Sequence, residues 1–506
     1  MYFSNLLDTI AKINETISDI VWVKIGLFLL IGTGILMTIR TGFFQFTNLK
    51  EWWSMTVGGV FKKSSSAKEN KDQGAISQFQ ALCTALAATI GTGNIAGVSC
   101  AICIGGPGAV FWMWVAAILG MMTSFSENIL GVYYRRKNAN GEWSGGAMYY
   151  LKDGLGSKKG CKLIGKVLAV LFACFTILAS FGIGNMAQIN TIVKNIESAF
   201  FQKYATNYAF GEISYTKLML GATLMVIGGV IILGGLKRIA SVTENIVPFM
   251  ACAYVLGALA IFVLHIDQVG AVFASIFKFA FGVRAVGGAA VGITMKEVFI
   301  QGYKRGVISN EAGLGSSVLV ISNSNVTEPV RQGMWGIFEV FADTIVVCTM
   351  TAIVVLSSGI INLETGFPAE GTVPETVVAQ VFKGNFGKVG EAFIAISILL
   401  FAFTTVLAWS HYGSKAVEYL FGEKAVKVYR FIFVMMIFVA STLTSSLAWD
   451  ISDTFNGMMM IPNLIAVIVL SPLVVKITKN YLERHHKGKN VEALLSYEQE
   501  ENVKKK

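Results

Sequence analysis

The sequence is poor in charged residues, prolines and histidines. Asp, Glu, Lys and Arg make up only 14% of its 506 residues, whereas soluble domains carry about 25%. Hydrophobic residues account for 54%, and the mean hydropathy is +0.61. The four histidines, two of them in the tail, supply neither a metal cluster nor a Ser/His/Asp set. The composition predicts an integral membrane protein that is not an enzyme.

Cysteine and charge patterns exclude further classes. The seven cysteines lie mostly inside apolar segments, and the CxxC at Cys100 and Cys103 has no second pair and no nearby histidine. The net charge of +10 comes mainly from Lys and Arg in loops between apolar runs, which indicates membrane topology rather than nucleic-acid binding. No nucleotide-binding segment is visible, so we expect no cofactor.

Eleven apolar runs are long enough to cross a bilayer as helices of about 20 residues. The 52 glycines favour closely packed helices, and the short alternating segments of a strand barrel are not seen. The sequence therefore predicts an all-α membrane protein with eleven transmembrane helices. The runs cover approximately residues 20–39, 76–104, 107–134, 163–183, 215–235, 241–265, 286–303, 330–358, 388–412, 426–448 and 454–477.

Basic residues are concentrated in alternate loops. The loop after the first run holds six Lys or Arg between Arg40 and Lys71, and the loop after the third holds seven between Arg135 and Lys162. Such loops remain in the cytoplasm. We therefore expect a multi-pass protein of the plasma (inner) membrane with its N-terminus outside and its C-terminus in the cytoplasm.

The chain divides into five parts by this pattern. An N-terminal span precedes a cytoplasmic loop whose aromatic and polar residues 43–61 are typical of an interfacial segment. Two groups of five spans follow, and a charged cytoplasmic tail ends the chain. The predicted parts are 1–40, 41–75, 76–265, 286–477 and 478–506.

The second run is interrupted near its middle by the stretch GTGNIAGV, which begins at Gly91. Glycine inside a helix costs about 1 kcal/mol relative to alanine, and an unwound turn in a membrane must be enclosed by protein. Broken helices of this kind form binding sites in secondary transporters.

GTGNIA also fits a dinucleotide fingerprint, but it lacks the strand before it and the acidic residue after it. Gly93 and Gly97 have GxxxG spacing, and packing explains Gly97 best, whereas Asn94 favours a site.

Two further stretches share this character. Gly182–Ile183–Gly184–Asn185–Met186–Ala187–Gln188 ends the fourth run, and Asn185 and Gln188 would share a helix face. A glycine-rich stretch at 287–292 interrupts the seventh run. Because the second and seventh runs are five spans apart, we expect a ten-helix core of two inverted five-helix repeats, each opening with a broken helix.

The ninth run carries adjacent hydroxyls, Thr404 and Thr405, in an apolar helix. Taken alone, each would bond to a carbonyl of its own helix. Together with carbonyls freed by a broken helix, they would suit a monovalent cation. Trp409 follows Thr405 by four residues and could close a small pocket on the same face.

The chain resembles the alanine or glycine:cation symporter family, the sodium:alanine symporters, over nearly its whole length. The resemblance rests on GTGNIAGV, on residues 305–316 with the string SNEAGLGS, and on residues 329–344 and 453–471. It implies a leucine-transporter-like fold and alternating-access symport of alanine or glycine with sodium. The sequence leaves open D or L preference, the number of sodium ions and the oligomeric state.

The resemblance also implies roles for particular residues. Thr92 and Gly93 would receive the amino-acid carboxylate, Gln188 would bind its amino group, and Asn94 would serve the substrate or a second cation. Trp409, Ala289 and Gly292 would wall the side-chain pocket, although relatives often carry an aromatic where this chain has Ala289. The sodium ion would be bound by Ala87, Ile90, Thr404 and Thr405.

Three acidic residues lie inside predicted spans: Glu127, Glu339 and Asp343. Glu339 and Asp343 are four residues apart and would share a helix face. Such residues are candidates for function, with Lys296 or Arg305 as partners. Structural pairing and proton coupling both remain open for them. A proton-coupled symporter and a non-transporting amino-acid sensor are the alternatives to sodium symport.

Overall fold

The computed structural model describes residues 2–61, 74–205, 208–210, 213–282, 295–443 and 447–496. This part of the chain is almost entirely helical. It contains two short antiparallel strand pairs, β1 (Arg136–Lys137) with β2 (Trp143–Ser144) and β3 (Tyr208–Phe210) with β4 (Ile213–Ser214). Residues 283–294, which include Ala289, Gly292 and the predicted break of the seventh run, lie outside the described residues.

The helices follow one another along the chain, and the connection between α18 and the 3-10 turn at 374–376 is one of the longer ones. Several are continued by π-helical turns at 19–26, 93–97, 150–155, 182–186 and 341–348. The α-helices are α1 (Tyr2–Ser18), α2 (Leu27–Arg40), α3 (Phe44–Thr47), α4 (Leu49–Met55), α5 (Val57–Phe61), α6 (Gln78–Thr89), α7 (Val98–Gly105), α8 (Gly108–Tyr134), α9 (Ala147–Tyr149), α10 (Lys162–Phe181), α11 (Ala187–Phe200), α12 (Tyr215–Ile232), α13 (Gly235–Leu264), α14 (Val269–Phe281), α15 (Met295–Asn310), α16 (Val318–Ile321), α17 (Pro329–Val340), α18 (Thr349–Leu356), α19 (Val377–Phe421), α20 (Glu423–Thr442) and α21 (Leu447–Lys487).

Nine helices in the described residues are long and apolar enough to cross a membrane, and the bent pair at 78–105 makes a tenth. These ten correspond one to one with ten of the eleven predicted runs, so the protein is a multi-pass membrane protein. The count of eleven is not reached, because the described part of the seventh run is α15, which has 16 residues and ends at Asn310 rather than at 303.

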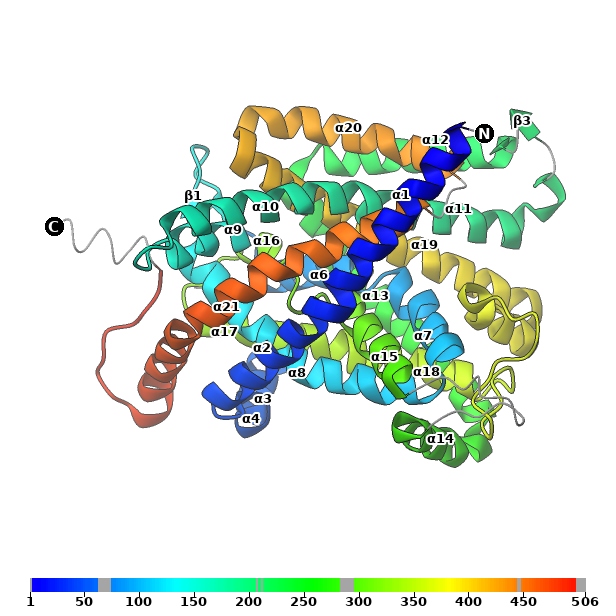
Figure 1. Ribbon diagram of the computed structural model, residues 1–506, viewed down its shortest axis with the longest axis horizontal. Helices are drawn as coiled ribbons and strands as arrows, with labels where there is room; N and C mark the ends of the chain where they lie inside the picture. The colour runs from blue at the N-terminus through cyan, green and yellow to red at the C-terminus, as the bar shows by residue number, and fades with distance from the viewer. Residues whose placement is uncertain are drawn as a thin grey trace.

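The bundle forms around two main packing groups. In the first, α8 lies against α15, α17 and α2, and α6 lies against α13 and α19. In the second, α12 pairs with α20, and α11 lies against α19; α12 and α20 run side by side along one edge in Figure 1. Helices from both predicted halves meet in each group. The inverted relation of the two halves stays a prediction.

Glycines set the closest helix contacts. A Cβ atom added to Gly336 of α17 would lie 2.4 Å from the Asn128 amide nitrogen of α8, and one added to Gly333 would lie 2.8 Å from the Phe125 ring. On the other side, a Cβ atom at Gly221 of α12 would lie 2.0 Å from Ser441 Oγ of α20. Small residues allow such approach where lipid provides no hydrophobic drive.

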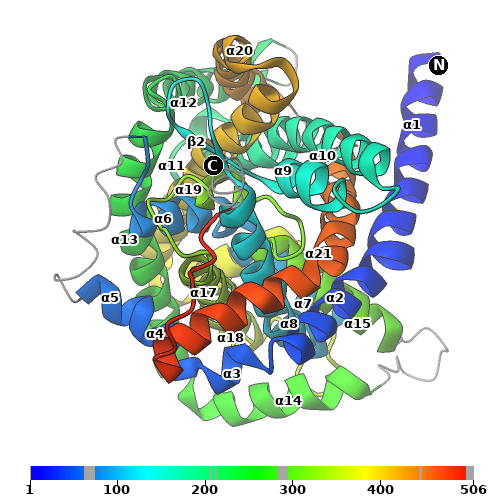
Figure 2. The ribbon, with the colours of Figure 1, turned by 90° about the vertical axis from the view of Figure 1, so that its left-hand side faces the viewer.

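The N-terminal helix lies outside this bundle. α1, α2 and the turn between them cross α21 (Figure 1), and α1 stands along the edge of the molecule in Figure 2. The Trp22 indole donates a hydrogen bond to the Asp453 carbonyl (3.2 Å), and Lys304 forms an ion pair with the Asp453 carboxylate (3.1 Å). The first interaction attaches the first span to α21, and the second joins α21 to α15 at the same residue.

Candidate functional site: a broken helix at the centre of the bundle

The second span is broken where the sequence predicts it. A capping box between Ser77 and Gln80 begins α6, and the helix ends at Thr89. Ile90 then leaves the helical region with ψ of 89°, and the chain resumes as the π-helical turn at Gly93. The two half-helices are bent by 51° relative to each other. The backbone groups of residues 87–92 are therefore free from a continuous helix ladder.

α19 closes one side of the break. The Thr405 hydroxyl donates to the Ala87 carbonyl at 2.9 Å, and a Cβ atom added to Gly91 would lie 2.8 Å from Thr405 Oγ1. Only glycine at position 91 lets the two segments approach this closely. The family resemblance implies that Ala87, Ile90 and Thr405 share a site, and all three residues are buried.

Thr404 has different partners from Thr405. Its hydroxyl bonds to the Leu400 and Phe401 carbonyls of its own helix and contacts Met250 Sδ of α13 at 3.6 Å. Adjacent residues of a helix point about 100° apart, so the pair does not present both hydroxyls to the break. The role of Thr404 as a sodium ligand stays a prediction without a contact at the break.

α11 closes another side through Gln188. The Thr92 hydroxyl lies 3.2 Å from Gln188 Oε1, and the Gln188 amide nitrogen donates to the Ile183 carbonyl. Asn185 does not share this environment, because its amide donates to the Phe433 carbonyl of α20 (2.9 Å). The π-helical turn at 182–186 changes the helical register. The expectation that Asn185 and Gln188 act on one face is therefore wrong.

Asn94 organises the interior side of the break. Its side-chain oxygen accepts a hydrogen bond from the Gly91 amide (2.9 Å), and its side-chain nitrogen donates to Ser309 Oγ (2.9 Å) and to Asp343 Oδ1 (2.6 Å). Ser309 and Thr344 donate to Asp343 Oδ2, each at 2.8 Å. This network connects the break with α15 and with the π-helical turn that follows α17.

Sequence reasoning missed this network. From the sequence, Ser309 is only part of the string SNEAGLGS, and Asp343 is expected to share a helix face with Glu339. In the structure, residue 310 ends α15, and the backbone turns through left-handed conformations at Glu311 (φ 55°), Gly313 (φ 96°) and Gly315 (φ 72°). The SNEAGLGS string therefore encodes a tight buried loop, and the strained Glu311 was not visible from composition.

Trp409 lies against the turn at 182–186. A Cβ atom at Gly184 would lie 2.4 Å from Trp409 Cβ, and the indole ring packs edge-on against Tyr412 at 5.3 Å. The Trp409 side chain is also a hydrogen-bond partner of Glu311. Trp409 is thus placed next to the fourth span and to the SNEAGLGS loop, as a wall residue would be.

The two glycines with GxxxG spacing are not tightly packed. A Cβ atom at Gly93 would lie 3.9 Å from the Ser309 Cα atom, and one at Gly97 would meet no atom of the described residues within 4 Å. The packing explanation for Gly97 therefore stays a prediction without a contact in the described part of the chain. Gly93 and Thr92 are both half-buried rather than fully buried.

None of the three intramembrane acids forms an ion pair with a Lys or Arg of the described residues. Glu127 instead accepts hydrogen bonds from the Asn463 side chain and from the Gly313 amide. Glu339 is 1% exposed, and neither of its carboxylate oxygens has a described partner. Arg305, expected as a partner, lies near Cys100 and Asp450. The expected pairing with Arg305 is absent from the part of the chain that the structure describes.

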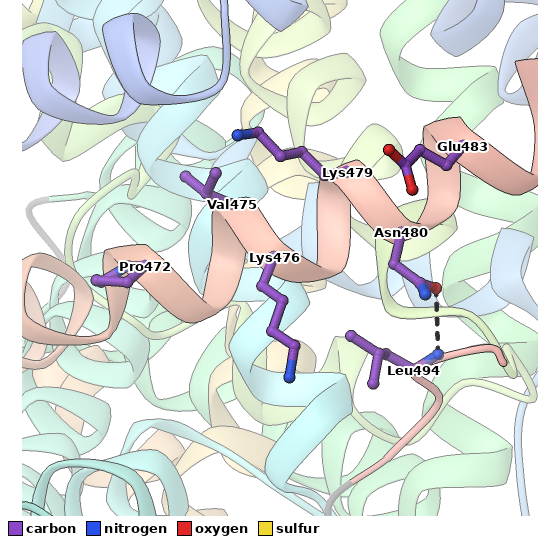
Figure 3. Close-up of a pocket in the computed structure, with 7 residues that line it drawn as sticks. All are labelled: Pro472, Val475, Lys476, Lys479, Asn480, Glu483 and Leu494. Carbon is purple, nitrogen blue, oxygen red and sulfur yellow. Dashed lines mark hydrogen bonds between the residues drawn. The ribbon is translucent and has the colours of Figure 1, made fainter. Parts of the chain in front are cut away.

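A separate surface pocket of about 460 Å³ lies at the C-terminal end of α21. It is lined by Lys476, Lys479, Asn480, Leu494 and three neighbours, and Asn480 accepts a hydrogen bond from the Leu494 amide at 3.3 Å (Figure 3). It shares no residue with the broken helix. We therefore place the candidate site at the break, where the buried polar groups converge.

The spans and the enclosed break define a multi-pass membrane protein whose second span carries a polar site. Residues 7–494 match the model of the sodium:alanine symporter family. The chain belongs to this family, which is one of transporters rather than enzymes.

The chain is similar to several curated proteins along nearly its full length. It is 40% identical over 485 residues to the sodium/alanine symporter AgcS of Methanococcus maripaludis, covering 96% of this chain and 100% of that protein. It is 36% identical over 475 residues to the probable sodium/glutamine symporter GlnT of Bacillus subtilis, covering 94% and 91%. It is 34% identical over 473 residues to the amino-acid carrier protein AlsT of the same organism, covering 93% and 92%.

Proposed function

We propose that this protein is a secondary active transporter that couples sodium entry to uptake of a small neutral amino acid, alanine or glycine, by alternating access. The observation that supports it most is the contact of Thr405 with the Ala87 carbonyl beside Gly91. This contact places a hydroxyl and backbone carbonyls, which are hard oxygen ligands, at a helix break. Such neutral oxygen groups suit a monovalent cation.

The amino acid binds next to this cation in the proposal. The NH groups of Thr92 and Gly93, at the start of the second half-helix, face the substrate carboxylate, since helix N-termini favour anions. The Gln188 carboxamide, already within reach of Thr92, accepts from the substrate ammonium group. The bulk of Trp409 limits the size of the substrate side chain, and the hydrogen bonds of Asn94 fix the conformation of the break. Ala289 and Gly292 complete the pocket in this proposal.

The coupling follows from differential affinity. Sodium bound between Ala87, Ile90, Thr404 and Thr405 stabilises one arrangement of the break, and that arrangement binds the amino acid better. Two inverted five-helix repeats of a leucine-transporter-like fold then rock to open the site to the cytoplasm. The N-terminus lies outside and the tail lies inside the plasma membrane in this proposal.

Uptake into proteoliposomes tests the function. We expect labelled alanine to accumulate with an inward sodium gradient and not with potassium, and unlabelled glycine to compete with it. Glutamine is the informative second competitor, because a relative is named for it. Competition by glutamine stronger than that by glycine would reject the small-substrate assignment. Equal accumulation without sodium would reject the coupling.

A further inference from the structure

The interior between α8, α17 and α19 holds a group of polar atoms without hydrogen-bond partners among the described residues. They are both carboxylate oxygens of Glu339, both amide atoms of Asn128 and the hydroxyl of Tyr412. These side chains are 1%, 0% and 0% exposed. About nine in ten buried polar groups in proteins are hydrogen-bonded, so three such side chains, on α8, α17 and α19, call for an explanation.

Charged groups around Glu339 make the explanation specific. Glu127 from α8, Glu311 from the loop after α15 and Asp343 from its own helix all act on it as negative neighbours. Tyr412 from α19 is close enough to interact electrostatically with Glu339.

The remaining neighbours of α17 bring no basic partner to Glu339 within the described residues. α6 contains no charged residue. The basic groups that α21 offers to α4 and α17 are engaged elsewhere: His486 contacts Glu51 (2.5 Å), and Arg484 pairs with Glu328 (2.7 Å) at the start of α17. Glu328 is 11 residues before Glu339, about 16 Å along a helix.

A carboxylate ion at this position would be poorly stabilised. Removing a charge from water costs several kcal/mol unless hydrogen bonds or an opposite charge replace the water. The other acids differ: Glu127 accepts from Asn463 and Gly313, and Asp343 accepts three side-chain hydrogen bonds. Glu339 alone among these three has no described hydrogen-bond donor that stabilises its ionised form.

The acids also do not converge as a multidentate cage. Among the described residues, no group of three or more His, Cys, Asp or Glu side chains is placed to hold a metal ion. A proton needs only one carboxylate oxygen. It is therefore the ion that fits Glu339 best.

We propose that Glu339 is a proton-binding site that takes up and releases a proton during the transport cycle. The inference rests on the proposed transport function and adds an ion to it. Glu339 lies one helical turn before Asp343, which bonds directly to Asn94 of the break. A change in the charge of Glu339 therefore reaches the substrate site through one turn of helix and one hydrogen bond, and the two binding events become linked.

Proteoliposomes loaded with a pH-sensitive dye test this site. For the wild type, we expect added alanine with sodium to evoke an internal pH change, and the initial uptake rate to vary several-fold between about pH 6 and about pH 8. For Glu339→Gln, which imitates the protonated acid, we expect sodium-driven uptake that no longer varies with pH and evokes no pH change.

The matched control is Glu127→Gln, which alters a buried acid whose two oxygens are both bonded. It should keep the pH dependence of uptake and the alanine-evoked signal.

Wild-type uptake without a pH signal, or a Glu339→Gln variant that keeps the signal, would overturn the proposal. A variant whose sodium affinity falls while its pH dependence persists would also overturn it, in favour of a cation site. If the variant does not fold, the wild-type pH signal decides. Absence of any wild-type uptake would instead reject the transport function itself.

Discussion

The break between α6 and α7 and the interior around Glu339 are both buried and polar, but their hydrogen bonding is opposite. At the break, Thr405, Asn94 and Gln188 each bond to a defined partner on another segment. Around Glu339, the carboxylate, the Asn128 amide and the Tyr412 hydroxyl have no partner in the described residues. The first region is held in one geometry by its own protein contacts, whereas the second lacks such contacts, and the proposed proton would neutralise its acid.

This difference fits the two kinds of ligand that we propose for these regions. Neutral carbonyls and hydroxyls fixed in position select an ion or substrate by geometry. A buried acid without hydrogen-bond donors favours a proton. Protonation neutralises the carboxylate and so removes the cost of keeping a charge away from water. Asp343 connects the regions, since it bonds to Asn94 and follows Glu339 by one turn.

The largest expected effect comes from filling the closest approach at the break. Gly91→Ala introduces a Cβ atom 2.8 Å from Thr405 Oγ1, and overpacking of about 1–3 kcal/mol lowers sodium-driven uptake by about 10- to 100-fold. Gly97→Ala is the control, because its Cβ atom meets no atom of the described residues within 4 Å. The initial uptake rate is measured for both variants. Equal losses would show that the effect does not come from the close approach of Gly91 to Thr405.

A second variant removes the hydroxyl on the Ala87 carbonyl. For Thr405→Ala, we expect the sodium concentration for half-maximal uptake to rise about tenfold, equivalent to about 1.4 kcal/mol, while Thr405→Ser restores it. Thr176→Ala is the control, since that buried hydroxyl bonds only to Phe172 of its own helix. An unchanged sodium dependence in Thr405→Ala would remove Thr405 from the cation site.

The two buried glutamates should differ in their effect on stability. Glu127→Gln replaces an acceptor of two hydrogen bonds and should lower the free energy of unfolding by about 1–3 kcal/mol. Glu339→Gln loses no hydrogen bond to a described residue and should change the melting temperature less. Thermal unfolding of the purified variants in detergent measures both. The reverse order would show that Glu339 has a structural partner.

The smallest effect concerns the N-terminal end of α17. Burial raises the pKa of Glu328, but hydrogen bonds from Arg484 and His485 outweigh it and hold the pKa below the ordinary value. A depressed carboxyl pKa stabilises the folded state above the unfolded pKa, and this stability is lost as pH falls through the folded pKa. Arg484→Ala should therefore cost about 1 kcal/mol at neutral pH and less below about pH 4.

The exposed pair of Lys489 and Glu483 provides the comparison for this prediction. Its side chains are 53% and 37% exposed, so Lys489→Ala should leave the melting temperature unchanged. If Arg484→Ala lowered the melting temperature equally at every pH, its effect would come from lost packing rather than from the Glu328 ion pair.

Much of the fold could be predicted because it depends on local sequence. Ten apolar runs correspond to spanning helices or to the bent pair, since about 20 apolar residues suffice to cross a bilayer. Gly91 and Gly93 marked the break, because glycine weakens a helix wherever it stands. Thr405 was placed at the break through family resemblance, and its contact with Ala87 agrees with that placement.

Other features could not be predicted because they depend on long-range contacts or on changes of helical register. The π-helical turn at 182–186 separates Asn185 from Gln188, and the one at 341–348 directs Asp343 toward Asn94. Periodicity counted at 3.6 residues per turn carries no sign of either turn. The surroundings of Gly97 likewise depend on which neighbour faces it.

The sequence by itself determined that this protein crosses the membrane many times, which span is broken and to which family the chain is similar. Hydropathy and glycine placement determine the local conformation of the chain, so their effects can be predicted one segment at a time. The tertiary structure decided which polar groups meet, from Asn94 with Asp343 to Glu339 with no described partner. These contacts join residues more than 200 positions apart in the case of Asn94, because inside a bundle every polar group must find its partner on whichever helix packs against it.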